Sequence, residues 1–140
     1  AEAKARKVAG SFPGAAVLGA DTVVACGRRI LPKTEQEEEA RACLALLSGR
    51  SHVVHGGICV VLEGRAHIRL VETRVTFKRL SLAETDHYID SGEWRGKAGG
   101  YAIQGLAAAH VSRINGSYSN VVGLGLHETV QLLRGLGVCP

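Results

Sequence analysis

The chain has 140 residues, of which 46% are hydrophobic and 21% charged, a composition typical of one globular domain. Its 17 Lys and Arg residues exceed its 13 Asp and Glu residues, which gives a formal net charge of +4. The chain lacks the run of about five or six like charges that would predict a nucleic-acid tail. It also lacks an apolar stretch that approaches the ~20 residues of a membrane helix. We therefore expect a cytoplasmic protein that handles an anionic small molecule and binds neither nucleic acid nor membrane.

The cysteines are too widely spaced for a zinc site or a disulfide framework, and they predict buried free thiols in a reducing cytoplasm. They are Cys26, Cys43, Cys59 and Cys139. The histidines lack H-E-x-x-H spacing, and we interpret His52 and His55 as polar strand residues. Because the chain contains no Met, we expect it to be a processed, truncated or incomplete piece.

The first elements along the chain are a helix and a buried strand. Residues 1–9 are rich in helix formers and predict a helix already under way. Residues 15–26 form an apolar run interrupted only by Asp21, as in a strand that is covered on both faces. A short return strand is expected at 30–31.

A second helix and a long hairpin follow. Residues 34–37 (TEQE) have the form of a capping box and predict a helix that ends at Ser48-Gly49. Residues 52–63 and 66–80 have strand patterns, and the short connection at 63–65 predicts an antiparallel hairpin with one wet face.

The last third of the chain predicts a helix, a strand and a final helix. A second capping box at 81–84 opens a helix that reaches about residue 92, and the glycine-rich passage 96–105 separates it from a strand at 107–114. A polar segment at 116–120 precedes a helix from about residue 126. The order of elements predicts an α/β domain with a mixed sheet.

Asp21 and Thr22 are the first candidates for chemistry. Burying an acid in an apolar strand raises its pKa unless a partner offsets the lost hydration, and strand ends line the ligand crevice in α/β sheets. Asp21 is therefore either a functional acid or a cap for the following amides, and Thr22 either belongs to the site or only suits a strand.

Two lysines and a glutamine are further candidates. Lys33 follows Pro32 and is either a phosphate ligand or a solvated surface residue; for Lys4 the solvated helix face is favoured. Gln104 lies among glycines, and its amide suits the reading of a base edge.

A polar segment near the C-terminus supplies the last candidates. Ser117, Ser119 and Asn120 either bind phosphate at a helix N-terminus or cap that helix, and the cap is favoured.

Taken together, the motifs resemble the Maf family of nucleoside triphosphate pyrophosphatases over essentially the whole chain. They are LGADTVV (18–24), LSGRSH (47–52), KAGGYAIQG (97–105) and RINGSYSNVVGL (113–124). The resemblance implies hydrolysis of a nucleoside triphosphate to the monophosphate and pyrophosphate with a divalent metal cation, Mg or Mn. It also implies an α/β fold with a mixed, elongated sheet flanked by helices and a deep cleft, related to the inosine-triphosphate pyrophosphatases, and a homodimer.

The resemblance also implies a role for each candidate residue. Asp21 matches the catalytic acid that accepts a proton from water and binds the metal directly or through water. Lys33 and Lys4 match phosphate ligands, and Thr22 and Gln104 match positions that separate subfamilies. Ala-Asp-Thr with Ile-Gln-Gly resembles the branch that acts on dTTP and UTP, and on modified pyrimidine triphosphates, to clean nucleotide pools.

The sequence departs from the family pattern in three places. Residues 1–140 are expected to be a single Maf-like domain that lacks the N-terminal Ser-x-Ser-Pro-Arg-Arg phosphate-binding loop. Pro32-Lys33-Thr34 replaces Gly-Lys-Pro, and Gly125 replaces a proline.

The alternative function is a non-catalytic, nucleotide-binding regulator of cell division and septum formation with the same fold.

Overall fold

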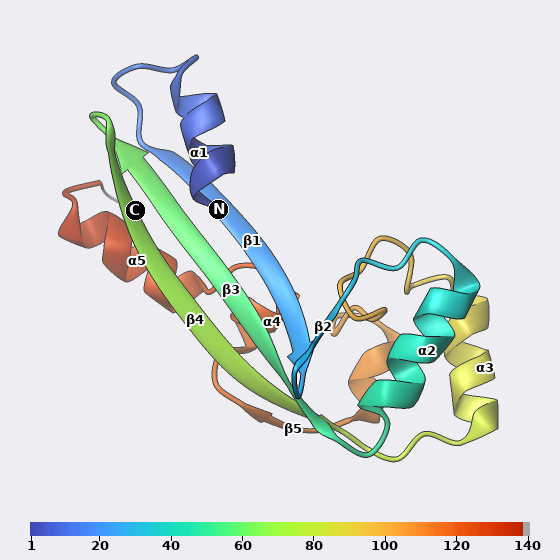
Figure 1. The fold of residues 1–140 in the computed structure, drawn as a ribbon. Helices are drawn as coiled ribbons and strands as arrows, with labels where there is room; N and C mark the ends of the chain where they lie inside the picture. The colour runs from blue at the N-terminus through green and yellow to red at the C-terminus, as the bar shows by residue number, and fades with distance from the viewer. Residues whose placement is uncertain (139–140) are drawn as a thin grey trace. The chain divides into compact units, whose positions relative to one another are not determined.

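The computed structural model describes residues 1–138, and Figure 1 shows its helices and strands coloured along the chain. The first half contains α1 (Glu2–Ala9), β1 (Val17–Cys26), β2 (Arg29–Leu31), α2 (Glu37–Leu47) and β3 (Ser51–Leu62). The second half contains β4 (Arg65–Phe77), α3 (Leu82–Ser91), the 3₁₀ helix η1 (Leu106–His110), β5 (Val111–Asn115), α4 (Tyr118–Val122) and α5 (Leu126–Gly135). Among the described residues, no helix combines the length and the apolar character required to cross a membrane.

The strands form one five-stranded sheet in the order β2-β1-β3-β4-β5. The pairs β1–β2 and β4–β5 are antiparallel, and the β4–β5 register shifts between Thr76 and Phe77. Glu63 and Gly64 connect β3 to β4 with φ values of 51° and 78°, the left-handed pair that a two-residue hairpin turn requires. The predicted hairpin and the α/β class, with helices beside a sheet, are confirmed.

The chain divides into two compact units. The first contains Ala1–Thr22, His55–Glu72 and the chain from Ser117 onward, and the second contains Val23–Val54 and Thr73–Gly116. Strands β1, β3 and β4 contribute residues to both units. Each unit has its own buried residues and is described by itself.

In the first unit, the sheet is packed on both faces, because alternate side chains of β3 point to opposite faces. Odd-numbered β3 residues join residues of α1 and β1 in one cluster: Ala5, Val17, Cys59 and Val61. Even-numbered β3 residues join residues of β4 and α5 in another: Ile58, Val60, Val71 and Leu132. The continuous apolar run in β3 is therefore explained by helices on both sides.

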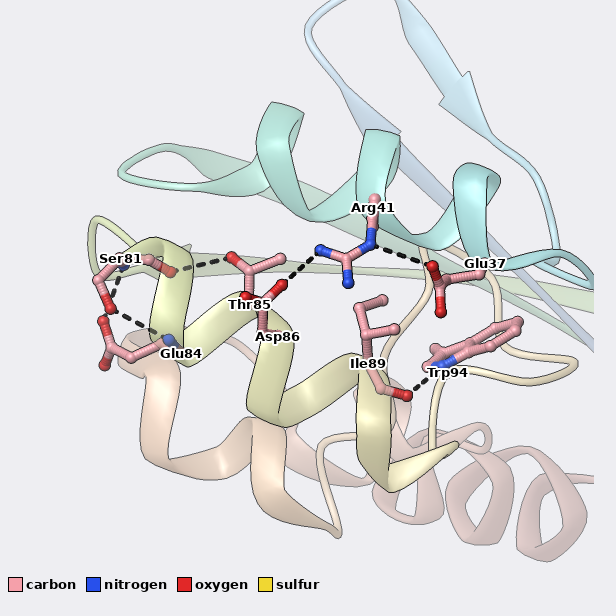
Figure 2. Close-up of polar contacts among 8 residues, drawn as sticks. All are labelled: Glu37, Arg41, Ser81, Glu84, Thr85, Asp86, Ile89 and Trp94. Carbon is pink, nitrogen blue, oxygen red and sulfur yellow. Dashed lines mark hydrogen bonds and ion pairs between the residues drawn. The ribbon is translucent and has the colours of Figure 1, made fainter.

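In the second unit, α2 and α3 pack together and share an ion pair. The guanidinium group of Arg41 donates to Asp86 at 2.7 Å and to Glu37 at 3.4 Å (Figure 2). The indole N–H of Trp94 donates to the carbonyl of Ile89 at 2.8 Å and so satisfies an end group of α3. The loop that follows α3 is thereby fixed to the helix.

An aromatic cluster fills the core of the second unit. His52, Phe77 and Tyr101 meet edge to face, with ring centroids 4.8 to 5.4 Å apart. His52 is buried, its Nε2 lies 2.6 Å from the Tyr101 hydroxyl, and burial lowers the pKa of its imidazole to about 4. His52 is thus a core residue, more deeply buried than a polar strand residue would be.

The predicted starts of α2 and β5 were wrong, and the predicted start of α3 was right. The N-cap of α2 is Gln36, whose N–H donates to Glu39, because Thr34 is buried and donates its hydroxyl to the Trp94 carbonyl at 2.6 Å instead. The strand expected at 107–114 begins only at Val111, since η1 occupies the preceding residues. The capping box that Ser81 opens is confirmed.

Candidate active site

Strand β1 presents Asp21 on the face that α1 covers. Val17, Gly19 and Asp21 alternate onto this face, and Val17 packs with Ala5 of α1. A Cβ atom on Gly19 would lie 2.7 Å from the Ala1 carbonyl oxygen and 3.0 Å from the Ala5 Cβ. Only glycine therefore lets the N-terminal turn of α1 lie directly on the strand, two residues before Asp21.

This close approach brings a cation to the Asp21 carboxylate. Oδ1 accepts a hydrogen bond from the Thr22 N–H at 3.0 Å and lies 3.5 Å from the Lys4 ammonium nitrogen. Oδ2 has no hydrogen-bond partner in the part of the chain that the structure describes. The side chains of Lys4 and Asp21 are 60% and 45% exposed, so both remain accessible to a ligand.

The surroundings keep Asp21 ionised. Desolvation is the largest single influence and raises the pKa of the carboxyl group, but the Thr22 hydrogen bond, the charge and hydrogen bond of Lys4 and the charge of the N-terminal amine together outweigh it. The pKa of Asp21 is therefore lowered from its ordinary value. Asp21 caps the following amide, as one alternative held, and still offers a free, charged oxygen.

Lys33 lies in the second unit, on a backbone that is fixed at both sides. It forms an isolated antiparallel bridge with Ala98, the Thr34 N–H donates to the Lys97 carbonyl at 3.1 Å, and the Gly99 N–H donates to the Pro32 carbonyl at 3.0 Å. The Lys33 side chain is exposed. The segment thus presents a solvated ammonium group from a fixed backbone.

Gln104 also belongs to the second unit and lies in a turn. The Gly105 N–H donates to the Ala102 carbonyl at 3.2 Å, and the Ala102 N–H donates to the hydroxyl of Tyr88 at 3.1 Å. The Gln104 side chain is exposed and makes no hydrogen bond to the described residues. Its carboxamide is therefore free to meet a ligand.

The polar segment near the C-terminus caps helices. Ser117 accepts from the Asn120 N–H at 3.2 Å, and Ser119 accepts from the Leu126 N–H at 3.0 Å. Asn120 is buried and donates from Nδ2 to the Val71 carbonyl at 3.2 Å. The capping alternative is confirmed for Ser117, which is the N-cap of α4.

The other singled-out histidine and cysteines take no part in these groups. His55 lies 3.4 Å from Glu72, and Cys26, Cys43 and Cys59 are free and buried, as predicted. Cys139 lies outside the described residues.

One positioning residue was missed in the sequence. Gly19 lies within the apolar run of residues 15–26, and a glycine inside a strand pattern indicates a close backbone approach. That signal would have placed a second element against β1 just before Asp21.

Within residues 1–138, no three His, Cys, Asp or Glu side chains gather as metal ligands. Asp21 is the carboxylate of the Lys4–Asp21 pair, and one carboxylate together with substrate phosphates is a donor set that Mg²⁺ commonly accepts. The donor chemistry therefore fits an ion that is shared with an anionic ligand, not one in a closed protein cage.

The chain matches the family model described as Maf-like protein over residues 1–136. A protein of Paramagnetospirillum magneticum is 67% identical over the whole chain, which spans 74% of that protein; one of Caulobacter vibrioides is 59% identical over 98% of the chain and 72% of its own length. One of Brucella abortus is 63% identical over 90% of the chain and 61% of its own length. All three are named dTTP/UTP pyrophosphatase. The matched residues cover nearly the entire chain, which therefore belongs to the Maf family.

Proposed function

We propose that the chain is a nucleoside triphosphate pyrophosphatase that hydrolyses dTTP and UTP to the monophosphate and pyrophosphate. The observation that carries this function is the ionised Asp21 carboxylate, with Oδ1 held by the Thr22 N–H and Lys4 while Oδ2 is free. The names of the similar proteins support the reaction and argue against a non-catalytic regulator of septum formation.

In this reaction, Asp21 is the general base. A water molecule attacks the α-phosphorus and gives its proton to the carboxylate, while the bond from the α-phosphorus to the bridging oxygen breaks and pyrophosphate leaves. General-base catalysis of this kind contributes ~10²–10⁴-fold to a rate. The lowered pKa of Asp21 keeps the carboxylate ready to accept the proton at neutral pH.

The lysines offset the charge of the triphosphate. A triphosphate carries about four negative charges, and fixed cations are most effective where charge develops on the leaving group. Lys4 lies beside Asp21 and Lys33 projects from a fixed backbone, so we assign both to the phosphates. Asp21 would hold Mg²⁺ or Mn²⁺ together with these phosphates, and the ion would neutralise the departing pyrophosphate.

Gln104 and Thr22 select the base. Thymine and uracil present an acceptor–donor–acceptor edge, and a carboxamide can donate to a carbonyl and accept from the imide N–H. The exposed, unpaired amide of Gln104 suits this pairing, and the resemblance to the family assigns Thr22 to specificity as well.

The test is the release of pyrophosphate from a panel of triphosphates with Mg²⁺, compared by kcat/KM. We expect dTTP and UTP to exceed dCTP, ATP and GTP. Binding of dTTP without any release of pyrophosphate would instead support the non-catalytic alternative.

We also retain two wider proposals. The protein acts in the cytoplasm on nucleotide pools, and it forms a homodimer, as the resemblance to the family implies. Light scattering at micromolar protein concentration tests the dimer, and a monomer mass would contradict it.

A further inference from the structure

Glu93 follows α3 at a point where the backbone is fixed on both sides. Gly92 ends the helix with a left-handed φ of 72°, and the buried Trp94 is tied to Ile89 by its indole hydrogen bond (Figure 2). Because both neighbours are anchored, the side chain of Glu93 starts from a defined position.

The Glu93 carboxylate lies against the turn that carries Gln104. Its Oε2 accepts a hydrogen bond from the Leu106 N–H at 2.9 Å. A Cβ atom on Gly105 would lie 2.5 Å from Oε2 and 2.6 Å from Oε1, so the carboxylate occupies the space that a side chain there would need. The absence of a side chain at Gly105 therefore lets the Glu93 carboxylate lie directly on the backbone that follows Gln104.

The other end of the same turn is held from α3. The hydroxyl of Tyr88 accepts from the Ala102 N–H at 3.1 Å, and Tyr88 is 1% exposed. Ile103 is buried as well, whereas Gln104 is exposed. The turn is thus fixed before and after Gln104 while the Gln104 side chain itself is left free.

We propose that Glu93 is a positioning residue for base recognition, which fixes the turn so that the Gln104 carboxamide meets the pyrimidine edge. This inference rests on the proposed function of Gln104. A glutamine side chain has several rotatable bonds, so its backbone must be fixed if it is to discriminate between two similar bases. A charged acceptor on a backbone N–H is stronger than a neutral one, which explains a carboxylate at this position.

The test compares Glu93→Ala, Glu93→Gln and Glu128→Ala by the ratio of kcat/KM for dTTP to that for dCTP. Glu128 is the matched control, because its Oε2 lies 2.7 Å from a Cβ placed on Gly125, the same contact of a carboxylate with a glycine in the other unit. Loss of the charged hydrogen bond in Glu93→Ala should lower the ratio about tenfold or more. Glu93→Gln keeps an acceptor and should stay within a few-fold of the unsubstituted protein, and Glu128→Ala should not change the ratio.

Amide hydrogen exchange distinguishes the effect of Glu93 on the turn from the proposed role of Gln104 in base recognition. Exchange at the Leu106 N–H should become faster in Glu93→Ala, whatever the substrate is. If the unsubstituted protein shows no preference for dTTP and UTP, the proposed function is wrong even when this exchange changes. If the preference exists but Glu93→Ala retains it, or Glu93→Gln loses it equally, or Glu128→Ala loses it as well, the role of Glu93 is wrong.

Discussion

Lys4 and Asp21 are 17 residues apart in the chain, and their Nζ and Oδ1 atoms lie 3.5 Å apart. The pair joins the first turns of α1 to β1 and depends on the close approach that Gly19 permits. An exposed ion pair of this kind contributes little to stability, ~0–1 kcal/mol at most. The pair therefore matters for the pKa and the reactivity of Asp21 more than for stability. Substitutions of either residue test this role.

Asp21→Asn should abolish most pyrophosphate release while the protein still folds. Asparagine keeps the size and the acceptor for the Thr22 N–H but cannot take a proton from water. Loss of a general base lowers a rate by ~10²–10⁴-fold. Steady-state kinetics with dTTP measures the loss, and circular dichroism checks the fold. Activity within a few-fold of the original would reduce Asp21 to a cap.

Lys4→Ala should move the acid limb of the pH–rate profile to higher pH. Desolvation already raises the pKa of Asp21, and Lys4 is one of the groups that outweigh it; without Lys4 the pKa rises and the base is protonated sooner as the pH falls. The measurement is kcat/KM for dTTP between pH 4 and 8. Lys7→Ala, an exposed lysine on the same helix, is the control and should leave the limb in place. An acid limb that Lys4→Ala leaves unmoved would contradict the assignment.

Gly19→Ala should destabilise the protein by about 1–3 kcal/mol, because the added methyl group collides with Ala1 and Ala5. Urea unfolding followed by circular dichroism measures the change. Gly135→Ala is the matched control, since nothing lies within 4 Å of its added Cβ and its φ is not positive. We expect that variant to be as stable as the original or slightly more stable. Equal stability of the two variants would show that α1 does not need the glycine.

Gln104→Glu should reduce the preference for dTTP and UTP more than it affects stability. Glutamate loses the amide donors and sets a negative charge against a base carbonyl, and a site built for polar pairing discriminates strongly when its groups are left unpaired. The ratio of kcat/KM for dTTP to that for dCTP, measured beside the urea midpoint, tests this. An unaltered substrate ranking would remove Gln104 from base recognition.

His52 should make stability depend on pH between about 4 and 6.5. Burial lowers its pKa to about 4, so the unfolded chain binds the proton more readily than the folded one in that window. This stability is fully present above pH 6.5 and is lost as the pH falls toward 4, and the loss by pH 5 is about 2 kcal/mol. His52→Gln should flatten the difference in urea stability between pH 7 and pH 5. An equal pH dependence in both proteins would contradict this.

Local patterns were sufficient where the deciding contacts are close in sequence. The Ser81 capping box joins residues three apart, and the β3–β4 hairpin needs only a left-handed pair at Glu63-Gly64. The pattern at Thr34 was misleading because its hydroxyl is taken by Trp94, 60 residues away. No local pattern contains that information.

The candidate residues show the same division. The sequence placed Asp21 on an apolar strand and Gln104 among glycines, and both were found on such segments. The contacts that surround them were not predictable, because Lys4 reaches Asp21 through helix packing and Glu93 reaches Gly105 across a loop. Packing between distant segments decides which side chains remain free.

The buried thiols provide each unit with an internal reporter. Cys59 belongs to the first unit, and Cys26 and Cys43 to the second. Burial raises the pKa of Cys43 and Cys59, so neither forms the reactive thiolate readily while its surroundings stay closed. An alkylating reagent therefore reacts with these cysteines only after local opening of the structure. The order in which the cysteine-containing peptides gain mass identifies which unit opens first.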